Sequence, residues 1–196
     1  MMMANKKLKL NNKGATLVEV IVVVAIMIVV IGGMTIGFSL ITNTYTRQTK
    51  DTLEDYIGSA RTKAKTVTAD EWNVEIAKES NGDYKFTLNK VVKEMKADGS
   101  ITSTPEVVDE KLVSGDVIIS FVNDTGYKVD IDDTSSNLKI VFEASKGSVS
   151  NIMVNDVSIA TDGDMGSMGT FTVTKGSFSK KLELYFITGK CEEVFD

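Results

Sequence analysis

Apolar and polar positions follow three different patterns along the chain, and the first pattern is almost wholly apolar. From Ala15 to Ile41 the only charged side chain is that of Glu19. As one helix this run would be about 40 Å long, against a bilayer hydrocarbon core of about 30 Å. The pattern predicts that residues 15–41 form a membrane-spanning helix.

After Ile41 the pattern becomes amphipathic. Apolar and small residues recur every three or four positions, and charged residues, Lys50 among them, occupy the intervening positions expected to face solvent. We expect the helix to continue to about Lys65 and to pack one face against a sheet. The residues of this stripe are Tyr45, Thr49, Leu53, Tyr56, Ala60, Ala64 and Val67.

From Glu71 onward, short runs of alternating apolar and polar residues predict β-strands. Asn81-Gly82 is typical of a tight hairpin turn, and a second turn is expected at Asn155-Asp156. Residues 91–96 are expected to form a helical turn and residues 162–169 a loop. The expected strands cover residues 72–76, 84–88, 117–122, 139–143, 148–154, 171–175 and 181–188.

Together these patterns predict an α+β fold. Its long N-terminal helix, membrane-spanning in the first half and amphipathic in the second, packs on an antiparallel β-sheet domain. The expected domains are a leader at 1–14, the helix at 15–66 with a transmembrane part at 15–41, and an extracellular β-rich domain at 67–196.

The distribution of charge predicts a cytoplasmic N-terminus and disfavours nucleic acid as a partner. Four lysines precede the apolar run without any acid, and such positive flanks stay in the cytoplasm: Lys6, Lys7, Lys9 and Lys13. The chain has a net charge of −5, so the remainder is more acidic still, and nucleic acid is not expected as a partner. A secretory signal peptide is disfavoured, because its apolar region is shorter, about 7 to 15 residues, and ends in a small-residue cleavage site.

The composition of the chain excludes several kinds of catalytic site. The chain has no histidine, which excludes Ser-His-Asp and Cys-His catalysis and histidine-based metal sites. Cys191 is the only cysteine, so no intramolecular disulfide can form. We therefore expect neither an enzyme nor a bound cofactor.

Two acidic runs are candidate calcium ligands, since calcium binds carboxylate oxygens. They are Asp130, Asp132 and Asp133, and Asp162 with Asp164. Neither run has the spacing of an EF-hand loop. Solvated turn residues are the favoured interpretation, and no metal site is predicted.

The residues at the start of the apolar run, KGATLVEVI at 13–21, resemble the cleavage motif of type IV prepilins and type II secretion pseudopilins. In that family a prepilin peptidase cuts after the glycine and methylates the new N-terminus. The resemblance implies a cut between Gly14 and Ala15, N-methylation of Ala15, and an assembly role for Glu19. The sequence departs from the family in having Ala15 where phenylalanine is most common, and in lacking a proline near Ile36.

The resemblance also implies partners and a location. The partners are the prepilin peptidase, other pilin subunits, the assembly platform with its ATPase, and membrane lipid before assembly. The protein would lie in the cell membrane with a cytoplasmic N-terminus before assembly, and in a cell-surface filament afterwards. Residues 185–190 and 59–64 loosely resemble H-type minor pseudopilins, which favours a minor subunit.

Glu19 also stands out on physical grounds. A carboxylate within an apolar helix is expected to have a partner, and cleavage would create one in the amine of Ala15. The alternative is that Glu19 extends to the lipid headgroups of an ordinary anchor. Two functions follow: a structural subunit of a type IV pilus, competence pseudopilus or secretion filament, or a single-pass anchored module that binds an extracellular ligand.

Overall fold

A computed structural model describes residues 16–66, 71–96, 98–113, 117–132, 134–159 and 166–194 of the chain. The side chains of residues 33–39 and 101 are not described. Gly14 and Ala15 lie outside the described residues. The chain divides into two compact units, Met1–Leu40 and Ile41–Asp196, and each is considered separately.

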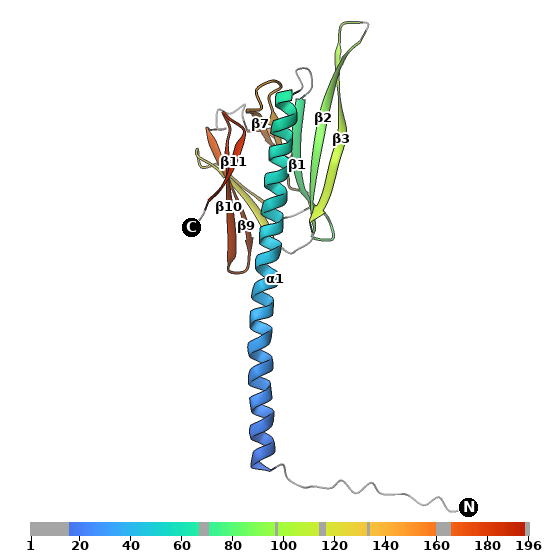
Figure 1. The fold of residues 1–196 in the computed structure, drawn as a ribbon. Helices are drawn as coiled ribbons and strands as arrows, with labels where there is room; N and C mark the ends of the chain where they lie inside the picture. Colours follow the sequence, from blue (N-terminus) through green and yellow to red (C-terminus); the bar gives the residue numbers. More distant parts are fainter. Residues whose placement is uncertain are drawn as a thin grey trace, which may run out of the picture. The chain divides into compact units, whose positions relative to one another are not determined.

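Helix α1, Leu17–Thr66, begins in the first unit (Figure 1). Over residues 17–32 its large apolar side chains are exposed on every side, by fractions from 47% at Val30 to 78% at Leu17. The described residues therefore do not cover this apolar surface.

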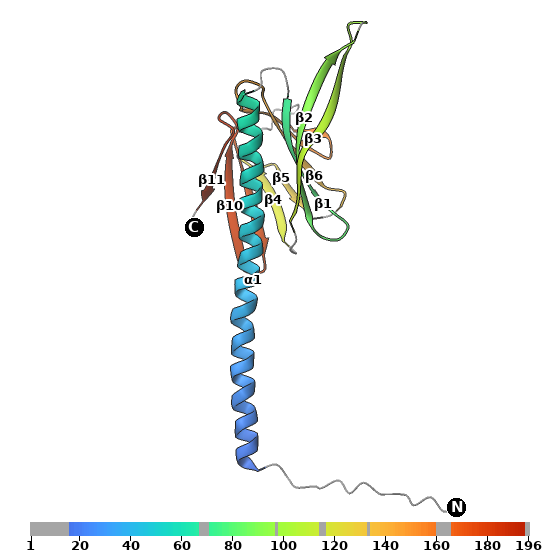
Figure 2. The ribbon, with the colours of Figure 1, turned by 45° about the vertical axis from the view of Figure 1, so that its right-hand side comes forward.

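In the second unit, α1 from Ile41 to Thr66 lies alongside strands of two sheets (Figures 1 and 2). Leu53, Ile57 and Ala60 are completely buried. The amphipathic stripe is confirmed as far as Ala64, as is the helix end near Lys65, whereas Val67 lies outside the described residues. The expectation that Lys50 faces solvent is wrong, because its side chain is only 5% exposed.

The strands form two antiparallel sheets. The six-stranded sheet has the order β3-β2-β1-β6-β7-β8 and the five-stranded sheet the order β11-β10-β9-β4-β5. The first contains β1 (Glu71–Lys78), β2 (Tyr84–Met95), β3 (Ile101–Val113), β6 (Asn137–Phe142), β7 (Val149–Val154) and β8 (Val157–Ser158). The second contains β4 (Ile118–Asn123), β5 (Lys128–Ile131), β9 (Met168–Lys175), β10 (Phe178–Tyr185) and β11 (Lys190–Val194).

The helix and both sheets of this unit share one hydrophobic core. Tyr56 of α1 contacts Phe86 of β2, with ring centroids 6.0 Å apart. The two sheets are joined by the buried hydroxyl of Tyr84, which donates to the carbonyl oxygen of Ile131 and accepts the N–H of Ile119 at 3.3 Å. Because buried polar groups need hydrogen-bond partners, this hydroxyl favours the packing of the two sheets in which both of its hydrogen bonds form.

The predicted fold class is wrong. The strands form two sheets instead of one, and the compact unit that contains them includes α1 only from Ile41. Among the described residues, no helix is both long and apolar enough to cross a bilayer.

Several local predictions can also be compared with the structure. The hairpin turn at Asn81-Gly82 is confirmed, with Gly82 in the left-handed region at φ +90°. The turn at Asn155-Asp156 is confirmed between β7 and β8. The helical turn predicted at residues 91–96 is wrong, because β2 continues to Met95.

Strand β3 was not predicted. It lies at the sheet edge with most of its side chains exposed, so it lacks the period of two that marks a half-buried strand. Pro105 also argues against a strand by composition, although proline is tolerated on edge strands.

Candidate functional site

The first candidate site is the N-terminus of α1, where Thr16 and Glu19 form reciprocal hydrogen bonds. Glu19 Oε2 accepts the backbone N–H of Thr16 at 2.7 Å and its hydroxyl at 3.1 Å. The Glu19 N–H in turn donates to Thr16 Oγ1 at 3.3 Å. This is a capping box, which satisfies donors that the first helical turn leaves unpaired.

The capping box gives Glu19 a local role that the sequence analysis missed. The Thr-x-x-Glu pattern at residues 16–19 would have revealed it. Among the described residues only Oε2 of this carboxylate has a hydrogen-bond partner, so Oε1 can accept from another group. Gly14 and Ala15, the predicted cleavage and methylation positions, lie outside the described residues.

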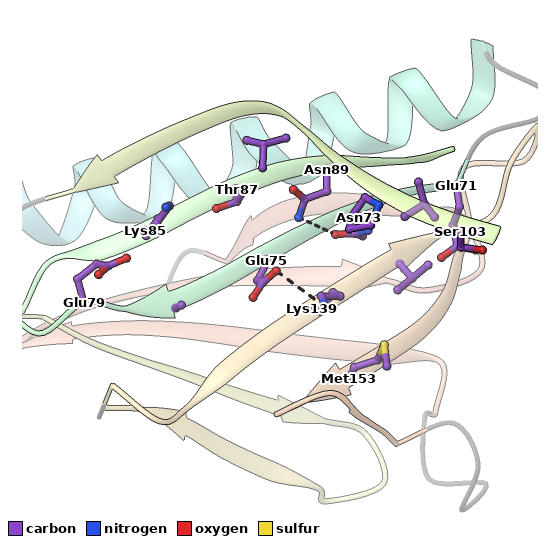
Figure 3. A pocket seen from close by; sticks show the side chains of 15 residues that line it. Glu71, Asn73, Glu75, Glu79, Lys85, Thr87, Asn89, Ser103, Lys139 and Met153 are labelled. Carbon is purple, nitrogen blue, oxygen red and sulfur yellow. Dashed lines mark hydrogen bonds and ion pairs between the residues drawn. The ribbon is translucent and has the colours of Figure 1, made fainter. Parts of the chain in front are cut away.

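A second candidate site is a groove on the face of the six-stranded sheet that points away from the core (Figure 3). We call it the sheet groove. It has a volume of about 680 Å³ and is lined by side chains of β1, β2, β3, β6 and β7. That volume is within the range of small-molecule sites, about 300 to 1,000 Å³.

The floor of the sheet groove is formed by a row of side chains that crosses four strands and by Thr87, which lies two residues from Asn89 along β2. Val107, Asn89, Asn73 and Val141 are direct neighbours in the strand register. Asn89 Nδ2 donates to Asn73 Oδ1 at 3.1 Å, as Figure 3 shows. Asn73 is only 4% exposed, Asn89 6% and Thr87 9%. Polar side chains are therefore nearly buried on the sheet face opposite the core.

Charged side chains at the rim of the sheet groove are paired with one another. Lys139 lies 2.9 Å from Asp156 and 3.9 Å from Glu75. Lys85 pairs with Glu110 at 3.1 Å, and Lys93 with Glu71 at 3.2 Å. With Glu79, which also lines the groove, the carboxylates at the rim outnumber the lysines, so the rim disfavours an anionic ligand.

Lys50 forms a different kind of cluster, between α1 and the last strand. Its Nζ lies 2.8 Å from Asp51, 3.0 Å from Glu54 and 3.0 Å from Glu193. Burial lowers the pKa of Lys50, but hydrogen bonds with these carboxylates outweigh it, so the pKa lies above its usual value. Because three carboxylates already pair with its ammonium group, Lys50 connects α1 with β11 and has little capacity left to bind a ligand.

The other residues singled out in the sequence form no site among those that the structure describes. Asp130 pairs with Lys128 at 2.9 Å, whereas Asp133, Asp162 and Asp164 are outside the described residues. In the described part of the chain, no group of three Cys, Asp or Glu residues is arranged to hold a metal. Burial raises the pKa of Cys191 to about 12, so its thiol is not a ready nucleophile.

Comparisons with known proteins returned no match. This holds for protein-family models, for curated proteins and for solved structures.

Proposed function

We propose that the protein is a structural subunit of a type IV pilus, competence pseudopilus or secretion filament, which polymerises through the N-terminal part of α1 after cleavage at Gly14. One observation carries the proposal. Starting within the prepilin-like motif, residues 17–32 of α1 present an apolar surface on all sides, interrupted by the single charge of Glu19.

That apolar surface needs a cover. Burying one Val, Leu or Ile side chain contributes about 1.5 to 3 kcal/mol, so a helix that is apolar all round is normally enclosed by other protein or lipid. In the proposed filament the same segment of neighbouring copies encloses it. Because each copy contributes an identical segment, the contact repeats along a filament.

Glu19 supplies the specificity of this contact. Cleavage after Gly14 gives Ala15 a methylated, cationic amine, four residues before Glu19. In an apolar bundle that amine requires a counter-ion, and Glu19 Oε1 of a neighbouring copy can provide it while Oε2 keeps the capping box with Thr16. The carboxylate would then cap the N-terminus of its own helix and also bind the next subunit.

The unit Ile41–Asp196 has its own core and would be displayed on the outside of the filament. A minor-subunit position, the assembly platform with its ATPase, and a membrane location before assembly stay predictions. We also predict that the chain has no catalytic activity.

Processing is the first test. The chain is co-expressed with an active prepilin peptidase, or with an inactivated one as control, and its intact mass is measured. We expect the active enzyme alone to remove residues 1–14 and to add one methyl group at Ala15. A chain that keeps its N-terminus beside an active peptidase would contradict the proposal and favour an anchored binding module.

A further inference from the structure

We propose that the sheet groove binds a neutral oligosaccharide. The groove lies entirely within the unit Ile41–Asp196, and the proposal does not depend on filament assembly. It rests on three nearly buried polar side chains in the floor, those of Asn73, Thr87 and Asn89.

These three side chains have hydrogen-bonding capacity that the protein does not use. The bond between the two asparagines leaves Asn73 Nδ2 and Asn89 Oδ1 unpaired, and the described residues offer no partner to Thr87 Oγ1. None of the three is among the fully enclosed unpaired atoms, so each reaches the groove. The floor thus presents an amide donor, an amide acceptor and a hydroxyl that can do both.

The ligand that matches this floor carries closely spaced neutral groups that can both donate and accept hydrogen bonds. Sugar hydroxyls have this property. Sugar rings also present C–H groups, and the groove offers apolar contacts to them at Val91, Val141 and Met153. Because nearly buried polar atoms are costly to leave unpaired, a ligand that satisfies all three gains affinity and specificity.

Two other classes of ligand fit less well. An anionic ligand would be repelled by the rim, where carboxylates outnumber lysines, and a cationic one would have to compete with ion pairs such as Lys139 with Asp156. An extended peptide is usually bound by the backbone of an open strand edge. The floor is instead a sheet face, and β1, at its centre, is paired on both sides with β2 and β6.

The test uses the full chain, kept in a detergent without a sugar headgroup because residues 17–32 expose apolar side chains. The probes are neutral pentasaccharides of glucose, mannose and N-acetylglucosamine, with an anionic heparin fragment for comparison. Binding is measured by saturation-transfer NMR and calorimetry. We expect saturable binding of at least one neutral pentasaccharide and none of the anionic fragment.

Variants locate the binding. Thr87→Val removes one hydroxyl without changing the side-chain shape and should weaken binding about fivefold. The double variant Asn73→Leu with Asn89→Leu removes both amides together and should weaken it at least tenfold. Thr172→Val is the matched control, because Thr172 is a half-buried threonine of β9 outside the groove. Circular dichroism confirms that each variant is folded.

Three results would overturn the proposal. The first is that no neutral pentasaccharide binds, or that the anionic fragment binds instead. The second is that both groove variants bind as tightly as the Thr172→Val control. The third is that the groove variants abolish self-association in sedimentation experiments while no saccharide binds, which would assign the groove to a second copy of the chain.

Discussion

Lys50 of α1 donates a hydrogen bond of 3.0 Å to Glu193 of β11, and the two residues are 143 positions apart in the chain. Lys180 of β10 donates to the other oxygen of the same carboxylate at 3.1 Å. The last strand is thus connected to the helix at the opposite end of the sequence, and this contact should matter for stability.

Replacing Lys50 by methionine should lower the free energy of unfolding by about 1 to 3 kcal/mol. The change leaves three carboxylates close together without their shared cation, although solvent screens them in part. Urea denaturation followed by circular dichroism measures the loss. Lys146→Met is the control, since Lys146 is 69% exposed and should cost less than about 0.5 kcal/mol. Equal losses would show that the cluster is not stabilising.

The same cluster predicts an acid-dependent loss of stability. Hydrogen bonds from Lys50 and then Lys180 lower the pKa of Glu193. An unfolded glutamate titrates near pH 4.3, so this stabilisation is present above that pH and disappears as the pH falls through the folded pKa. Urea midpoints from pH 7 to pH 3 should therefore fall more steeply for the wild type than for Glu193→Gln. Parallel curves would contradict the assignment.

Two glycines with similar backbone angles should differ in how they tolerate alanine. Gly189 has φ +63° and Gly176 has φ +59°. A Cβ at Gly189 would lie 1.9 Å from the carbonyl oxygen of Gly147, whereas a Cβ at Gly176 meets no atom within 4 Å. Gly176→Ala should lower the free energy of unfolding by only about 1 to 2 kcal/mol, because alanine must then adopt the left-handed conformation. Gly189→Ala should lower the free energy of unfolding by at least about 2 kcal/mol more, because the backbone must move. Urea denaturation measures both losses, and similar values for the two variants would argue against this close approach.

The thiol of Cys191 should be slow to react in the folded protein. Burial raises its pKa to about 12, and the thiolate is the reactive form. At pH 8.5, alkylation by iodoacetamide should be at least tenfold slower in the native protein than in urea, since an unfolded cysteine has a pKa near 8.5. Mass spectrometry over time measures both rates. Comparable rates would show that the thiol is accessible.

Glu19→Gln separates the two proposed roles of this residue. Glutamine can still accept the Thr16 N–H in the capping box, so the helix start should be kept. The amine of a neighbouring Ala15 would lose its counter-ion, and an unpaired buried charge typically costs about 3 to 5 kcal/mol. We therefore expect normal cleavage but few or no sheared surface filaments. Thr16→Ala, which removes the cap hydroxyl and keeps the charge, should still assemble.

The amount of filament must be compared at equal levels of processed protein. If Glu19→Gln enters filaments as well as the wild type, the pairing mechanism is wrong and Glu19 acts only as a helix cap. If Thr16→Ala also fails to assemble, the helix start itself is what assembly requires.

Local patterns predicted much of the fold but not its arrangement. The stripe from Thr49 to Ala64 and the turn at Asn81-Gly82 follow from neighbouring residues, and both are confirmed. The capping box was equally readable from Thr16 and Glu19, although it was missed. The edge strand β3 could not be read, because a strand with most side chains exposed shows no alternation.

By itself, the sequence determined where the chain changes character, at Ile41, and which residues form the prepilin-like motif around Gly14 and Glu19. Both are properties of adjacent residues. Only the tertiary structure decided that β1 pairs with β6, that Lys50 is buried, and that Asn73 and Asn89 form the floor of a groove. Hydrophobic periodicity reports which face of an element is apolar. It does not report which distant strand or carboxylate will lie against that element, because this depends on contacts between residues far apart in the chain.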